Sequence, residues 1–216
     1  MYMPKDEGNF ELAPEGAHSA VCYRVIDLGT QQGDYMGQPK RQHKILINWE
    51  MPGALMTDGR PFSIGRKYTF SSSTKSALRQ DLESWRGKPF TEADLSGAPG
   101  AFDIKNLLGA PCLLNVVHEV KQTGTFANIR SIMRLPKEMA KPKPVNAFVY
   151  FSLADRPFNR AVFDALSENM RALIAKSPEY AEAVNPARTN DHDAPEERGG
   201  GEAGFNDDVP FAPSMI

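Results

Sequence analysis

The chain has 216 residues, of which 41% are hydrophobic and 24% charged, and its formal net charge at pH 7 is −2. This composition supports a buried core for a single domain with an appendage. No apolar run approaches the roughly 20 residues of a membrane-spanning helix, and the polar N-terminal stretch lacks the apolar segment of a secretory signal, so we expect a cytoplasmic protein.

The charge is unevenly distributed along the chain. From Asn185 onward two arginines stand against seven acidic residues, a net charge of −5, which leaves +3 for the residues before it. A basic body with an acidic end indicates either nucleic-acid binding or an interaction tail. An ordinary domain with a solvated end would show the same pattern.

Cysteine and histidine residues give no sign of a metal site. Cys22 and Cys112 each lie in an apolar run, which predicts buried free thiols. The four histidines are scattered, and neither residue type shows the paired spacing of zinc ligands. We therefore predict no metal and no cofactor.

Three β-strands are predicted in the first third of the chain, where runs of β-branched and aromatic residues are separated by turn residues. The strands cover residues 18–29, 41–51 and 62–73. Residues 30–40 are rich in Gly and Gln, which predicts a loop between the first two strands. Alternation in the third strand gives one shared face to Phe62, Ile64, Arg66, Tyr68 and Phe70.

One helix and two further strands follow. Leu78, Leu82 and Trp85 recur at helical spacing, which predicts a helix that starts at Ser73 or Thr74 and ends at Gly87. The fourth and fifth strands are predicted at residues 111–121 and 125–135. Strict alternation would place on one face of the fifth strand Phe126, Asn128, Arg130, Ile132 and Arg134.

The rest of the chain divides at a proline-rich break near residue 140. Residues 146–153 predict a strand, and residues 157–177 predict a single helix. From about Asn185 the chain consists mainly of Gly, Glu, Asp, Pro and Asn. Such a segment buries too little apolar surface to offset the entropy of ordering, which predicts a disordered acidic tail.

The order β-β-β-α-β-β favours a mainly β protein built on a five-stranded OB-fold barrel, with another small barrel or a sandwich as the alternatives. We expect an OB-fold domain at residues 1–140, a C-terminal helical appendage at 141–184 and the acidic tail at 185–216. An OB-fold binds its ligand on strands 2 and 3, between the loops that join strands 1–2 and 4–5.

Basic and aromatic residues are interleaved along the segments that would form this ligand face. Cations track phosphates and flat rings stack on bases, so the pattern favours single-stranded nucleic acid. Each aromatic residue taken alone could instead belong to the core. The predicted nucleic-acid-binding residues are Tyr35, Lys40, Arg41, Lys44, Arg66, Lys67, Tyr68, Lys121, Phe126 and Arg130.

Catalytic motifs are not evident. The sequence shows no phosphate-binding loop and no nucleophile elbow, so we predict no catalytic residue and no enzyme activity. A metal-dependent nuclease would have to assemble carboxylates such as Asp27, Glu50 and Asp58, which is the less favoured alternative.

The acidic tail carries a small apolar hook near its end. Asp207 and Asp208 are followed by Val209, Pro210 and Phe211. The apolar residues would fill a pocket on a protein partner, and the two acids would meet basic residues at its rim. We expect Phe211 to be the anchor, since aromatic residues often dominate such contacts.

The segment "DDVPF" resembles the acidic tip of bacterial single-stranded-DNA-binding proteins, which recruits replication and repair partners in that family. Here "APSMI" follows Phe211, whereas the bacterial tip ends at the phenylalanine carboxylate. A partner that clamps that carboxylate would lose the contact.

The body resembles a family of tailed-phage proteins in the segments "YRVIDLGTQ", "NWEMPG" and "DLESWRGKPFT", over roughly residues 10–180. Members of that family are similar to OB-fold single-stranded-DNA-binding proteins encoded near replication and recombination functions. The resemblance implies a bacteriophage protein in the host cytoplasm that coats single-stranded DNA, largely without sequence preference, during DNA replication, recombination or repair. Three alternatives stay open: a strand-annealing or recombination-mediator protein, the nuclease, and an adaptor that binds only protein.

Overall fold

The computed structural model describes residues 11–35 and 37–185, the side chains of Asp34 and Tyr35 excepted. The chain divides into two units, Met1–Asn185 and Pro186–Ile216. The second unit, which carries the predicted partner-binding tip, lies outside the described residues. The strands are β1 (Gly16–Tyr35), β2 (Gln38–Leu55), β3 (Pro61–Thr69), β4 (Pro111–Lys121), β5 (Gly124–Arg134) and β6 (Val149–Phe151). The helices are α1 (Ala77–Arg86), α2 (Arg160–Asp164), α3 (Glu168–Ile174) and α4 (Pro178–Val184), with short 3₁₀ turns η1 (Ala93–Leu95) and η2 (Ile104–Leu107).

The six strands form one sheet in the order β3-β2-β1-β4-β5, with β6 parallel to β1 and all other pairs antiparallel. The mainly β architecture with a helix between β3 and β4 is therefore confirmed. Strand β1 is long enough to pair with β4 through Gly16–Val21 and with β2 from Val21 to Tyr35. Among the described residues no hydrogen-bonded ladder joins β3 to β5, so the sheet is not closed into a barrel.

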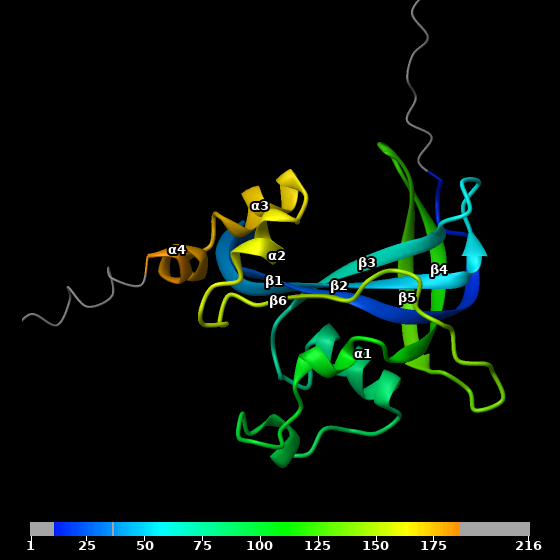
Figure 1. The fold of residues 1–216 in the computed structure, drawn as a ribbon, viewed down its shortest axis with the longest axis horizontal. Coiled ribbons are helices and arrows are strands. Elements are labelled where there is room, and N and C mark those ends of the chain that lie inside the picture. Colours follow the sequence, from blue (N-terminus) through cyan, green and yellow to red (C-terminus); the bar gives the residue numbers. More distant parts are fainter. Residues whose placement is uncertain (1–10, 36, 186–216) are drawn as a thin grey trace, which may run out of the picture. The chain divides into compact units, whose positions relative to one another are not determined.

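The central strands are buried on both faces. Neighbouring residues of a strand point to opposite sides, and on β2 Ile45 and Ile47 enter one core while Leu46 enters another. We call the first side the inner face and the second the outer face. Helix α1 covers the inner face, and α2 and α3 lie on the opposite side of the sheet (Figure 1). Because both faces of the sheet are covered, β2 is buried without interruption from Ile45 to Met51.

Helix α1 begins later than predicted. Ser76 is its N-cap, and its hydroxyl accepts a hydrogen bond from the Arg79 backbone N–H at 3.1 Å. Gly87 ends the helix as predicted, with a φ of 71° that favours glycine. Leu78, Leu82 and Trp85 enter the inner core, and the Trp85 indole N–H donates to the carbonyl of Pro111 at 2.8 Å.

The predicted loop at residues 30–40 is instead a β-hairpin. Strands β1 and β2 stay paired out to Tyr35 and Gln38, beyond the edge of either core. Both sides of this ribbon meet solvent over much of its length, so its residues lack the apolar alternation that identifies a strand in a sequence.

The predicted single helix at 157–177 is also wrong. The segment forms α2 and α3, and α4 follows directly. Each of the three begins after a residue that favours helix starts, namely Asn159, Ser167 and Ser177. The breaks let Phe163, Leu166 and Ile174 all reach the outer core.

A bulge overturns the face predicted for β5. The β4–β5 register shifts between Asn115 and Val116, and as a result Ile129 and Ile132 are both buried. Ile132 therefore belongs to the core, whereas Phe126 and Arg130 are exposed. Both cysteines are buried and unpaired, and burial raises the pKa of the Cys22 thiol to about 12. Among the described residues no helix has the length and apolar character required to cross a membrane.

A buried carboxylate ties the segment after β5 to the sheet. Glu50 is 0% exposed and accepts hydrogen bonds from the backbone N–H groups of Val145 at 2.7 Å and Asn146 at 3.0 Å, and from the Asn146 side-chain amide. These partners replace the water that the carboxylate loses on burial.

Replacing Glu50 by glutamine should lower the free energy of unfolding by about 2–4 kcal/mol, because an amide nitrogen would then face N–H donors and leave buried groups unpaired. Urea unfolding of the full chain measures the change. Glu138→Gln, at an exposed position, should alter stability by less than about 0.5 kcal/mol. An equally small effect at Glu50 would contradict the anchoring role.

Candidate nucleic-acid interface

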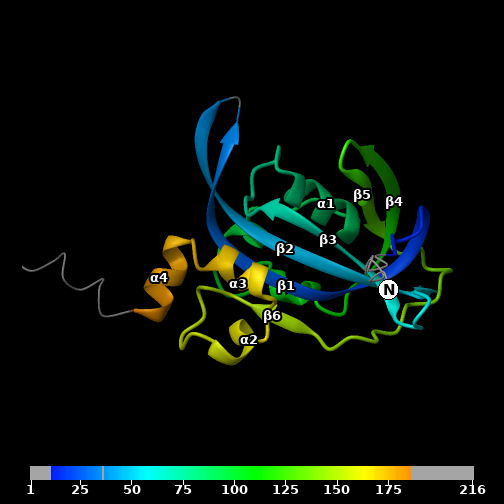
Figure 2. The same cartoon turned by 90° about the horizontal axis from the view of Figure 1, so that it is seen from above.

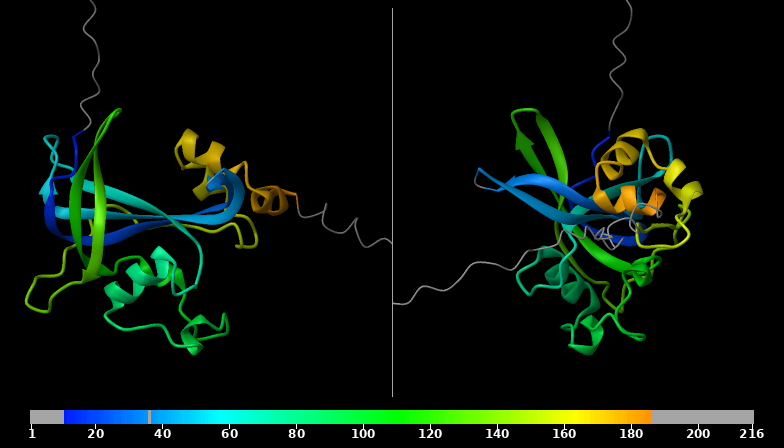
Figure 3. Two further views of the ribbon diagram at one scale, coloured as in Figure 1. Left: turned by 180° about the vertical axis from the view of Figure 1, so that it is seen from behind. Right: turned by 90° about the vertical axis from the view of Figure 1, so that its left-hand side faces the viewer.

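The β1–β2 hairpin projects from the sheet as an arm, here defined as residues 30–35 and 37–43. The arm and the β4–β5 hairpin extend to the same side of the sheet with β3 between them (Figure 2), and both point away from the C-terminal helices (Figure 3). Lys40 and Arg41 are exposed on the arm. Tyr35 pairs with Gln38 at the end of the arm, and its side chain lies outside the described part of the chain.

Lysines gather on the outer face at the base of the arm. Alternation along β2 places Lys40, Lys44 and Leu46 on one side, and Lys67 lies opposite Leu46 on β3. Lys44 donates to Gln42 Oε1 at 2.7 Å and to Thr69 Oγ1 at 2.9 Å, both neutral acceptors. Partial burial, together with the nearby charge of Lys40, lowers the pKa of Lys44. An anion placed here would relieve this concentration of positive charge.

A groove of about 380 Å³ separates β3 from the β4–β5 hairpin. Ser63 and Gly65 line it from β3, and Lys121, Phe126 and Asn128 line it from the hairpin. The segment before β1, residues 11–13, forms a third wall and includes the acidic Glu11. Phe126 is 43% exposed, and the ammonium group of Lys121 lies 5.9 Å from the centre of its ring. Arg130 is exposed farther along β5.

Glycine occupies position 65 on the β3 side of the groove, where a side chain would be crowded. A side chain there would place its Cβ only 2.5 Å from the amide nitrogen of Asn48. No side chain covers the β3 backbone at Gly65, so the backbone is accessible from the groove at this point.

Arg66 and Tyr68 lie on the inner face and belong to a different cluster. Tyr68 is 3% exposed, and its hydroxyl donates to Asp81 Oδ2 on α1 at 2.8 Å. Arg66 pairs with the same carboxylate oxygen at 2.9 Å. Burial and the Asp81 carboxylate raise the pKa of Tyr68. The prediction that the Tyr68 ring stacks on a base is therefore wrong, and the charge of Arg66 is already compensated.

The predicted set did not contain Phe70, an exposed aromatic residue near the arm. Phe70 follows the end of β3, is 50% exposed, and its ring centre lies 5.5 Å from that of His43. Alternation grouped Phe70 with the core residues of β3. Because β3 ends at Thr69, the chain passes beyond the core at this point.

The carboxylates of the nuclease alternative each have another partner. Asp58 forms an ion pair with Arg60 at 2.6 Å, Glu50 binds backbone N–H groups, and Asp27 binds His43. In the part of the chain that the structure describes, no three His, Cys, Asp or Glu side chains lie together as a metal site would require.

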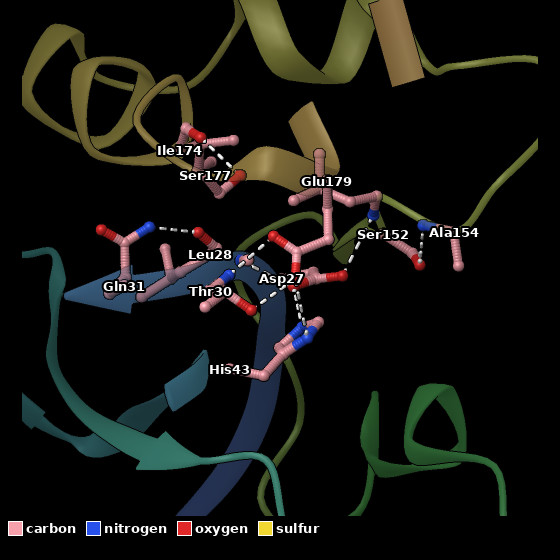
Figure 4. Close-up of polar contacts among 12 residues, drawn as sticks. Asp27, Leu28, Thr30, Gln31, His43, Ser152, Ala154, Ile174, Ser177 and Glu179 are labelled. Atoms are coloured by element: carbon pink, nitrogen blue, oxygen red, sulfur yellow. Dashed lines mark hydrogen bonds and ion pairs between the residues drawn. The ribbon is translucent and has the colours of Figure 1, made fainter. Parts of the chain in front are cut away.

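A polar network fixes the base of the arm to α4 (Figure 4). His43 Nε2 lies 2.6 Å from Asp27 Oδ1, and His43 Nδ1 lies 3.7 Å from Glu179 Oε1. Glu179 accepts hydrogen bonds from the backbone N–H of Thr30 at 2.8 Å and from the Thr30 hydroxyl. Asp27 also accepts from the N–H of Leu153 at 3.1 Å. The network thereby links β1, β2 and the C-terminal helices.

The ionisation states in this network support one another. The hydrogen bond to Asp27 raises the pKa of His43, against the opposing effect of burial. Burial alone would raise the pKa of Asp27 and Glu179, but hydrogen bonds outweigh it, from His43 to Asp27 and from Thr30 to Glu179. Both carboxyl pKa values therefore lie below their ordinary range.

No protein-family model matches the sequence, and comparison with curated protein sequences gives no match.

The network predicts a bounded pH range of greatest stability. The contribution of His43 is fully present below its ordinary pKa of 6.5 and is lost as the pH rises through its raised pKa. The contributions of Asp27 and Glu179 are present above roughly pH 4.5 and are lost as the pH falls through their lowered pKa values. Urea unfolding should show greatest stability between about pH 4.5 and 6.5.

His43→Gln tests the source of this dependence. The variant should be less stable than the wild type below about pH 6.5. Its free energy of unfolding should also fall much less than that of the wild type as the pH rises above this value. An unchanged decline in the variant would show that another group causes it.

Proposed function

We propose that the protein binds single-stranded DNA in the groove between β3 and the β4–β5 hairpin, without strong sequence preference. The observation that carries this proposal is the exposed Phe126 ring, which lines the groove beside Lys121 and opposite β3. A ring that can stack on a base and a cation that can neutralise a phosphate are the two elements of sequence-tolerant single-strand binding.

The strand order supports an OB-fold for the described residues. The order β3-β2-β1-β4-β5, the helix between β3 and β4, and a long β1 shared by two pairings are all features of that fold. An OB barrel is partly open, which accommodates the missing ladder between β3 and β5. The arm and the β4–β5 hairpin then correspond to the two connections that flank the OB ligand face.

Single strands suit this groove better than a duplex. Stacking requires an unpaired base whose face is accessible, and each stacked base contributes about 1–3 kcal/mol. Lys44 and Lys67 would hold the backbone on the outer face, while Phe126 would take a base at the hairpin. Arg66 and Tyr68 would act indirectly, by holding α1 against β3.

The biological setting follows from the resemblance to phage proteins. We propose that the protein coats single strands during phage DNA replication, recombination or repair and itself catalyses no reaction. Residues Asp207–Phe211 would recruit replication and recombination proteins to the coated strand.

The neighbouring residues Arg66 and Lys67 provide a matched test because they point to opposite faces. Lys67→Ala should weaken binding of labelled oligo(dT) and reduce the slope of log affinity against log salt by about 0.7, since one phosphate contact is lost. Arg66→Ala should leave that slope unchanged and lower the urea midpoint, because it breaks the ion pair with Asp81. Equal effects of both variants on the salt slope would overturn the assignment of faces.

Phe126→Ala should weaken oligo(dT) binding by about 1–3 kcal/mol with little change in the salt slope, since the ring contributes stacking and carries no charge. Phe148→Ala, an exposed phenylalanine in the segment before β6, serves as the control. Fluorescence anisotropy with oligo(dT) and a duplex of equal length measures both. If the wild-type chain binds the duplex as tightly as the single strand, the proposed function is wrong.

A further inference from the structure

A second basic site lies beside α1. This pocket, called here the basic pocket, has a volume of about 550 Å³. Its cationic lining consists of Arg86, Arg134, Lys137 and Lys141, and Phe102 and Met139 form part of its apolar wall. No acidic side chain of residues 11–35 or 37–185 lines it.

Arg86 is held at the edge of α1 by an ion pair and by a contact with an aromatic ring. Its Nη2 atom lies 3.2 Å from Asp94 Oδ1, and its guanidinium carbon lies 4.1 Å from the centre of the Phe90 ring. The Nη1 atom is enclosed and has no hydrogen-bond acceptor among the described residues. A guanidinium in this position favours an anion nearby.

The other cations come from the end of β5 and the segment that follows it. Arg134 crosses the end of α1 above Gly87, where an added Cβ would lie 3.2 Å from Arg134 Cδ. Lys137 and Lys141 are exposed. Asp94 compensates the charge of Arg86, so the positive charge of the pocket comes from Arg134, Lys137 and Lys141.

The basic pocket and the groove lie at opposite ends of β5, since Arg134 at its last position lines the pocket and Phe126 near its start lines the groove. Phe126 and Arg134 are separated by about 26 Å along the strand, at about 3.3 Å per residue. Arg130 is exposed between them. A nucleic-acid strand leaving the groove would therefore meet a cation on its way to the pocket.

We propose that the basic pocket binds one nucleotide unit, with its phosphate on Arg134, Lys137 and Lys141 and its base against Phe102 and Met139. The volume lies within the range of about 300–1,000 Å³ that is typical of small-ligand pockets. Two sources of this nucleotide offer the same chemistry. One is the bound DNA strand, which rests on the proposed function, and the other is a free nucleotide.

The test compares two double variants with the same change in net charge. Lys137→Ser with Lys141→Ser removes pocket cations, and Arg160→Ser with Lys176→Ser removes exposed cations from the C-terminal segment. Each is titrated with oligo(dT) of about 5 and about 16 nucleotides, which span the site sizes of OB-folds. Urea unfolding checks that both variants remain folded.

The pocket variant should bind the short oligonucleotide as the control does. It should bind the long one more weakly, with a salt slope shallower by about 1.4, since each of two lost contacts removes about 0.7. In the wild-type chain, thymidine monophosphate should shift the NMR signal of the Trp85 indole N–H, which lies in the pocket wall, and the pocket variant should lose this shift.

The outcomes separate the two possible sources of the nucleotide. A monophosphate-induced shift without any effect on the long oligonucleotide would assign the pocket to a free nucleotide. An equal shift with inorganic phosphate would show that the base is not bound, which contradicts the proposal.

If the wild type binds both oligonucleotides, the two double variants agree at both lengths, and the monophosphate causes no shift, the pocket proposal is wrong while the proposed function stands. If no oligonucleotide binds, the proposed function fails, and the monophosphate titration alone decides the pocket.

Discussion

The burial of β1 and β2 on both faces is the constraint on which the rest of the structure depends. A sheet with one solvated face could end where its single core ends. Here Ile26, Leu28 and Leu46 need apolar partners on the outer face, and Phe151, Leu153 and the short C-terminal helices provide them. Each such side chain contributes about 1.5–3 kcal/mol when fully buried. The C-terminal segment is therefore part of the same folded unit as the sheet.

This arrangement also determines where a ligand can bind. The C-terminal segment covers part of the outer face of β1 and β2, while exposed residues remain on β3, the arm and the β4–β5 hairpin. The Asp27–His43–Glu179 network holds the arm where β1 and β2 leave the two cores. A ribbon with both faces in solvent needs such an attachment, since an isolated two-stranded hairpin is at best marginally stable.

The sequence predicted the elements in which apolar residues recur at regular spacing, including five strands and the Leu78–Leu82–Trp85 face of α1. The predictions were wrong where this spacing is absent or interrupted. The arm has too few buried residues to show alternation, and the bulge near Asn115 moved Ile132 out of the predicted face. Interleaving of basic and aromatic residues indicated β2, β3 and β5 as the candidate interface, but only the structure separates the exposed Lys67 from the buried Tyr68. The ion pair between Arg66 and Asp81 on α1 joins two elements and has no signal in the sequence.

Photo-crosslinking of an oligonucleotide containing iodouracil, followed by mass spectrometry of the adducts, tests most directly whether the groove holds a single strand. The account predicts adducts at Phe126 or Phe70, which an unlabelled single strand suppresses and a duplex of equal length does not. Adducts confined to α2, α3 and α4, or equal suppression by the duplex, would contradict it.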